Sequence, residues 1–129
     1  MRLGEKQRLF TYLSAQLIIW CYENDYELSF GETVRSKAQA EANATAGIGI
    51  INTLHSPDIR LAIDLNLFLD ASLEGDEDIY QTDSEAYRPL GEKWKSLHPL
   101  CRWGGDFKDK EGNPKPDGNH FSLEHEGRK

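Results

Sequence analysis

The residues best suited to chemistry in this chain are His55, Asp64 and His120, which lie far apart in the sequence. His120 follows an Asp-Gly pair that favours a tight turn, and the residues after it have the pattern of a short strand. Two imidazoles and one carboxylate can bind a metal ion and leave one position open, as in hydrolytic zinc enzymes. The residue types therefore indicate a three-ligand metal site, if the fold brings the three segments together.

The size and composition of the chain limit the classes of protein to consider. With 129 residues, it is long enough for one compact domain and too short for two conventional ones. Apolar residues make up 38% and charged residues 29%, the balance of a globular protein. The formal net charge of −7 argues against general binding to nucleic acid or anionic lipid, although a local basic patch is compatible with it.

The apolar run at 17–22 is interpreted as part of a mature helix. Polar residues interrupt the approach to it, and acidic residues rather than a small-residue cleavage site follow. No stretch approaches the roughly 20 apolar residues that span a bilayer. We therefore expect cytoplasmic synthesis and no membrane insertion. Cys21 and Cys101 could pair, but two cysteines in a domain of this size favour free thiols.

The spacing of apolar residues predicts helices and strands in alternation. Residues 4–23 have helical spacing, and 59–69 form the clearest strand because branched apolar residues occupy every second position. Asp64 lies on the other face of that strand, between Ala62 and Asn66, with room for an ion above it. The other predicted elements are a strand at 27–32, a helix at 36–46, a helix capped by Thr82 or Ser84 that ends before Pro99, a strand at 101–107, and a strand after the turn at 117–118.

These elements predict an α+β fold, with helices covering an antiparallel sheet and the metal site on the sheet face. Nine positions separate His55 from Asp64, so the two cannot lie on one face of a regular strand or helix. Pro57 breaks regular structure just after His55. We therefore expect His55 in a loop that folds back over the face carrying Asp64.

Three short segments together resemble a known signature, with Thr at 53 where the signature has Ser. They are Thr-Leu-His at 53–55, Ala-Ile-Asp at 62–64 and Asp-Gly-Asn-His at 117–120. The pattern resembles that of zinc peptidases, the family that includes D-alanyl-D-alanine carboxypeptidases and the phage and bacterial L-alanyl-D-glutamate endopeptidases. The stretches 61–68 and 103–107 also look like small phage members, so the resemblance covers most of the chain from about residue 28.

Two further features differ from the usual family pattern. Nine positions separate His55 from Asp64, where the family usually has seven, and the loop around Pro57 could absorb the difference. The acidic residue three positions before the second histidine is often Glu in the family, whereas Asp117 has a shorter side chain.

The resemblance implies a mechanism as well as a fold. His55, Asp64 and His120 would hold Zn²⁺ and leave a fourth position for water. Asp117 would take a proton from that water and pass it to the leaving amine. Arg35 resembles the family arginine that grips a substrate carboxylate, a task suited to a planar bidentate donor, although it could also be a helix-end or salt-bridge residue. The implied substrate is a peptidoglycan stem peptide, which offers carboxylates and L-to-D linkages.

The leading hypothesis is thus a zinc-dependent L-alanyl-D-glutamate endopeptidase of the phage endolysin type, acting at the cell wall after a separate membrane-permeabilising protein has released it. The alternatives are a D-alanyl-D-alanine carboxypeptidase and a non-catalytic wall-binding or virion module with the same fold. Other residues have plain structural interpretations. His98 and His125 are interpreted as surface or hydrogen-bonded residues, Trp103 as a core or cleft-wall aromatic, and Asp106 as the partner of a neighbouring lysine.

Overall fold

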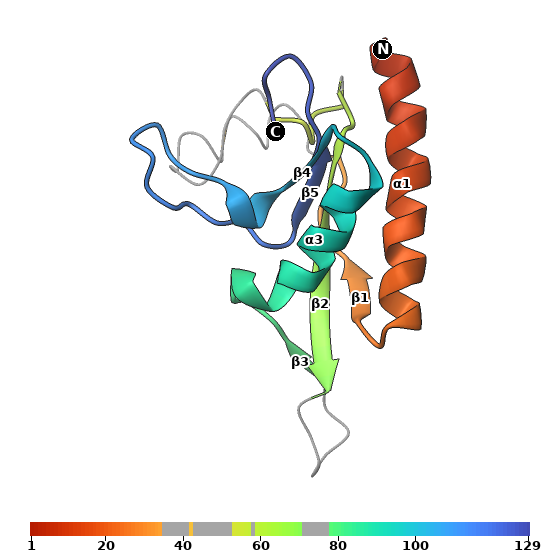
Figure 1. Ribbon diagram of the computed structural model, residues 1–129, viewed down its shortest axis with the longest axis vertical. Coiled ribbons are helices and arrows are strands. Elements are labelled where there is room, and N and C mark those ends of the chain that lie inside the picture. The colour runs from red at the N-terminus through yellow and green to blue at the C-terminus, as the bar shows by residue number, and fades with distance from the viewer. Residues whose placement is uncertain (35–41, 43–52, 58, 71–77) are drawn as a thin grey trace.

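Helices packed against an antiparallel sheet form the fold, which confirms the predicted α+β class (Figure 1). The computed structural model describes residues 1–34, 42, 53–57, 59–70 and 78–129. The elements found among these residues are, in chain order, α1 (Leu3–Glu23), β1 (Glu27–Phe30), β2 (Ala62–Asp70), β3 (Asp78–Tyr80), the 3-10 helix η1 (Ser84–Tyr87), α3 (Arg88–Leu97), β4 (Cys101–Trp103), the 3-10 helix η2 (Gly104–Asp106) and β5 (His120–Leu123).

The strand β2 is the centre of the sheet, and every strand pair is antiparallel. β1 pairs with one edge of β2, while β5 and β3 pair with successive parts of the other edge, and β4 lies beyond β5. Between β5 and β3, the hydroxyl of Tyr87 accepts the amide N–H of Leu67 at 3.0 Å and donates to the carbonyl of Gln81 at 2.9 Å. This side chain therefore satisfies main-chain groups where one partner strand has ended and the next has not begun.

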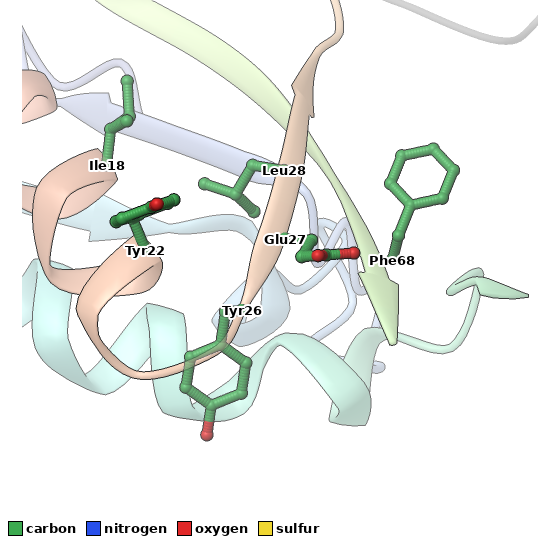
Figure 2. A pocket seen from close by; sticks show the side chains of 6 residues that line it. All are labelled: Ile18, Tyr22, Tyr26, Glu27, Leu28 and Phe68. Atoms are coloured by element: carbon green, nitrogen blue, oxygen red, sulfur yellow. The ribbon is translucent and has the colours of Figure 1, made fainter. Parts of the chain in front are cut away.

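The two faces of β2 have different surroundings, as its alternating sequence predicts. Ile63, Leu65 and Leu67 are at most 4% exposed and belong to the apolar core with α1 and α3. Figure 2 shows the same division at β1, where Leu28 lies on the side of Ile18 and Tyr22 from α1, while Glu27 and Phe68 lie on the other side. The helices thus cover one face, and the face with Asp64 is turned away from them.

The helix α1 contributes a narrow apolar stripe to the core. Phe10, Leu13, Leu17 and Cys21 are buried, and the Phe10 ring meets that of Trp94 edge to face with centroids 5.8 Å apart. None of the helices in the described part of the chain is long and apolar enough to cross a membrane.

Both cysteine thiols are free, as the sequence favoured. Cys21 and Cys101 are 0% and 3% exposed, and burial raises the pKa of each thiol to about 12. Burial raises these pKa values because an apolar environment disfavours the charged thiolate. Both residues therefore act as small apolar side chains in the core.

The indole of Trp103 is enclosed by two glycines. A Cβ on Gly91 of α3 would lie 2.1 Å from the ring, and a Cβ on Gly105 would lie 2.2 Å from it. Trp103 is 1% exposed, which confirms its interpretation as a core aromatic. The absence of side chains at these two positions therefore allows α3 to approach β4 closely.

Several predicted boundaries are wrong by a few residues. The strand predicted at 59–69 begins at Ala62, because Arg60 has a φ of 54°, which a strand does not allow. The strands predicted at 27–32 and 101–107 end at Phe30 and Trp103.

The predicted start of the helix after β3 is also wrong. Neither Thr82 nor Ser84 caps it; instead the Asp83 carboxylate accepts the amide N–H of Glu85 at 3.1 Å and caps η1, which leads into α3. The helix predicted at 36–46 lies, apart from residue 42, outside the described residues.

We expect Gly91→Ala to destabilise the protein by about 1–3 kcal/mol, the usual cost of overpacking a core. Alanine favours helix by about 1 kcal/mol over glycine, but the added methyl group would lie 2.1 Å from the Trp103 ring, which Gly105 also approaches closely. Urea unfolding measures the effect. Gly4→Ala, whose Cβ would lie 3.4 Å from the Arg8 guanidinium, is the control and should not destabilise. Equal stability of the two variants would contradict this account.

Candidate metal centre

Three side chains from separate segments meet on the sheet face turned away from α1 and α3. Asp64 lies on β2 and His120 begins β5, and the two are direct partners in the antiparallel ladder. His55 comes from the loop that precedes β2. One possible ligand atom of each residue lies within 4.8 Å of those of the other two. The structure thus brings together the three residues that the sequence analysis proposed as ligands.

The distances between the three ligand atoms fit a single small cation. His55 Nε2 lies 3.3 Å from His120 Nδ1 and 3.3 Å from Asp64 Oδ1. His120 Nδ1 lies 3.7 Å from Asp64 Oδ1. Ligands bound tetrahedrally at about 2.0–2.1 Å from an ion are about 3.3–3.4 Å from one another. The group could therefore hold a metal ion with only small movements of its side chains.

A turn in the loop before β2 brings His55 to Asp64 from nine positions away. The carbonyl of Ser56 accepts two main-chain N–H groups, three and four positions further on, each at 3.0 Å. The amide of Leu61 then donates to the carbonyl of Leu54 at 2.9 Å, so the two sides of the loop lie against each other. His55 consequently folds back over the face of β2, as expected, and the loop accommodates the longer spacing.

The histidine rings are held by contacts outside the ligand group. His55 Nδ1 lies 3.3 Å from the carbonyl of Thr33, and a proton on this nitrogen would leave the lone pair of Nε2 directed to the ion. The main-chain N–H of His55 donates to Thr53 Oγ1 at 3.1 Å. The His120 ring packs against Phe107, with centroids 5.2 Å apart. Both imidazoles are almost completely buried, so their orientation is restricted.

The electrostatics of Asp64 favour a bound cation. Burial raises the pKa of this carboxyl, but the neighbouring His120 and His55 outweigh burial and hold the pKa at about 2. Its Oδ1 atom is buried and, among the described residues, no group donates a hydrogen bond to it with regular geometry. A buried carboxylate oxygen without a donor is costly, and a metal ion would satisfy it. The donor set therefore fits a divalent ion.

The turn before β5 is fixed by hydrogen bonds from distant segments. Ser84 Oγ accepts the amide N–H of Gly118 at 2.9 Å, and Trp103 Nε1 donates to the carbonyl of Gly118 at 2.7 Å. The amide of Asp117 donates to the carbonyl of Gly104 at 2.8 Å. Gly104 must lack a side chain, since a Cβ would lie 1.9 Å from the Asp117 carbonyl. These contacts position the second imidazole, and the sequence analysis assigned none of them.

The main chain of Asp117 lies next to His120. The side chain of Asp117 is exposed, and its carbonyl accepts the amide N–H of His120 at 3.1 Å. Asp117 and Asn119 also line a polar recess of about 170 Å³, together with residues of β3 and η1. Arg35 lies outside the described residues, so its predicted contact with a substrate carboxylate stays a prediction.

The other polar residues that were weighed have plain structural contacts. His98 Nδ1 accepts a main-chain N–H two residues later, at 3.1 Å. His125 Nδ1 lies 3.2 Å from Lys6 Nζ, and Asp106 Oδ2 lies 2.7 Å from Lys95 Nζ. These contacts confirm the structural interpretations made from the sequence.

A larger recess lies away from the ligand group. It has a volume of about 530 Å³ and opens between the C-terminal end of α1 and the strands β1 and β2 (Figure 2). Apolar side chains dominate it, and none of the three ligand residues lines it. The lining residues are Ile18, Tyr22, Tyr26, Glu27, Leu28 and Phe68.

Comparison with known proteins adds no further argument, since no protein-family model and no curated protein matches the chain.

We expect the purified protein to bind one divalent transition-metal ion per chain. His55→Ala or His120→Ala should lower the affinity by more than about 100-fold, because even the loss of an outer partner of a ligand costs about 10–100-fold. His125→Ala removes a histidine outside the group and should leave the affinity unchanged. Titration calorimetry on metal-free protein gives the affinities, and equal values for all three variants would rule out this site.

In the metal-free protein, the low pKa of Asp64 should make stability depend on pH in acid. Its folded-state pKa of about 2 lies below the usual value of 3.8, so the carboxylate stabilises the fold above pH ~4 and this contribution is lost as pH falls towards 2. The contribution is about 2 kcal/mol. Urea unfolding of the wild type and Asp64→Asn should give free energies whose difference shrinks over this range. A difference independent of pH would refute the assignment.

Proposed function

We propose that the chain is a zinc-dependent hydrolase that cleaves peptidoglycan stem peptides, with an L-alanyl-D-glutamate bond as the first candidate. The observation that carries the proposal is the convergence of His55, Asp64 and His120 at separations of 3.3–3.7 Å. Three ligands come from the described part of the chain, and a site with three protein ligands leaves a position for water or substrate, whereas structural zinc sites usually have four. This number of ligands supports the proposal of a catalytic role.

The chemistry of the ligands favours zinc over the lighter divalent ions. Magnesium and calcium prefer oxygen ligands and higher coordination numbers, while two imidazoles and one carboxylate are a common set for zinc. Two of the three ligand separations are 3.3 Å, which agrees with a tetrahedral ion of short bond length. When bound, such an ion would supply a Lewis acid that activates water and polarises a carbonyl group.

We assign the transfer of the proton to Asp117. Asp117 is exposed, and its main-chain carbonyl accepts the amide N–H of His120, so the residue is close to this ligand in the chain and in space. A general base in this place could take the proton of the attacking water and deliver it to the leaving amine. The hydrogen bonds that hold Gly118 would keep the carboxylate in position during this transfer.

The substrate class comes from the resemblance in three short segments, and the site geometry is compatible with it. In this proposal Arg35 binds a carboxylate of the stem peptide, which an acidic protein needs in order to hold an acidic substrate. The same site could remove a terminal D-alanine as a carboxypeptidase. Mass spectrometry of digested muropeptides separates the two reactions, because only the carboxypeptidase releases free D-alanine.

We expect the zinc-loaded protein to release new amino groups from purified peptidoglycan. Asp117→Ala should lower kcat by about 10²–10⁴-fold, the usual contribution of a general base, and leave zinc affinity unchanged. Glu111→Ala, which removes an exposed carboxylate from the same loop, is the matched control and should retain full activity. A zinc-loaded wild type that binds peptidoglycan without any cleavage would instead identify a binding module.

A further inference from the structure

A row of side chains begins at the candidate metal centre and continues along the sheet. On the face of β2 that carries Asp64, the next side chains are Asn66 and Phe68, and both are partly exposed. The ladder partner of Asn66 is Ser29 on β1, and those of Phe68 are Glu27 on β1 and Tyr80 on β3; all three are exposed. Because cross-strand partners point to the same face, these side chains form a continuous row from the ligand group towards the far end of β2.

The polar recess beside Asp117 adjoins this row. Tyr80 and Asn119 line the recess, and Asn119 Nδ2 donates to Asn66 Oδ1 at 3.4 Å. The recess has a volume of about 170 Å³, which is smaller than the roughly 300–1,000 Å³ of a pocket that encloses a whole small ligand. The recess can therefore take one part of a larger substrate, whose remainder extends to the metal centre.

The amide side chains of the row fit the main chain of a peptide in an extended conformation. The amides of Asn66 and Asn119 each offer donors and an acceptor, which match the N–H and C=O groups of a peptide. Their mutual bond of 3.4 Å and the 3.5 Å contact from Asn66 Nδ2 to Ser29 Oγ are long, so both amides can turn to a ligand at little cost. Glu27, the partner of Phe68 on β1, adds a carboxylate at the aromatic end of the row.

The distance from the metal centre to the aromatic end of the row sets the length of peptide that the row can bind. The rings of Phe68 and Tyr80 are 5.5 Å apart and form a partly exposed apolar surface. Four residues of strand separate Asp64 from Phe68, a distance of about 13 Å, which is also the length of about four extended peptide residues.

We propose that the row from Asn66 and Asn119 to Tyr80 binds the part of the substrate on one side of the scissile bond, as an extended peptide of three or four residues. This inference rests on the proposed function, because it assumes that the metal centre cuts a peptide. It assigns substrate specificity to residues that neither bind the ion nor move the proton.

The test uses the zinc-loaded full chain and stem peptides of increasing length. Asn66→Ala and Tyr80→Ala should each raise KM for the longest peptide about three- to tenfold, the effect of one lost hydrogen bond or contact, with kcat and zinc affinity unchanged. A peptide cut back to the residues flanking the scissile bond should show no such difference. Gln16→Ala and Tyr12→Ala on α1 are matched amide and aromatic controls and should leave KM unchanged.

Direct binding separates failure of this inference from failure of the proposed function. If the wild type cleaves no peptide, the proposed function fails, but calorimetry with the longest peptide still decides the inference. Tighter binding to the wild type than to Asn66→Ala and Tyr80→Ala supports the peptide site. Tyr80→Phe keeps the ring and should bind like the wild type, which guards against a variant that misfolds. Equal KM and equal binding in all variants, or no binding at all, would overturn the inference.

Discussion

The register between β2 and β5 is the constraint on which the candidate site depends. Asp64 stands opposite His120, and the adjacent pair, Ile63 and Phe121, points to the core, where the two side chains are 4% and 0% exposed. A slip of one residue would expose the apolar pair to solvent and turn the ligands away from each other. The hydrophobic effect therefore enforces the ligand geometry: burial of one pair of side chains sets the position of the next.

The Trp103 indole links the packing on the helical side of the sheet to the candidate site. Gly91 and Gly105 both approach the Trp103 indole closely, so the position of the ring follows from the approach of α3 to β4. The same indole donates to the carbonyl of Gly118 in the turn before β5. Because protein cores are close-packed, the Trp103 ring has little freedom to move. Its hydrogen bond to Gly118 therefore restricts the turn as well. Helix packing and the position of Asp117 are thus parts of one arrangement.

Local patterns in the sequence predicted the features that depend on neighbouring residues. The alternation along β2 placed Asp64 on the face opposite the core, and the break near Pro57 predicted that the loop would return to it. The bonds to Gly118 were not predictable, since they join it to Ser84 and Trp103, which are distant in the sequence, and no spacing rule connects them.

Strand ends were also harder to predict than strand cores. Arg60 has a positive φ, so the strand begins only after it, although the residue type gives no sign of this conformation. The alternation of apolar residues continues through this point, so periodicity alone places the start of β2 too early.

The two buried thiols have a consequence for the conditions that the fold tolerates. With a pKa of about 12, only about one in 10⁵ of the Cys21 or Cys101 side chains is ionised at neutral pH, and the thiolate is the form that oxidants and disulfides attack. Neither thiol is paired with another sulfur, and neither offers an exposed nucleophile. The folded chain should therefore keep the same covalent structure in reducing and in oxidising surroundings.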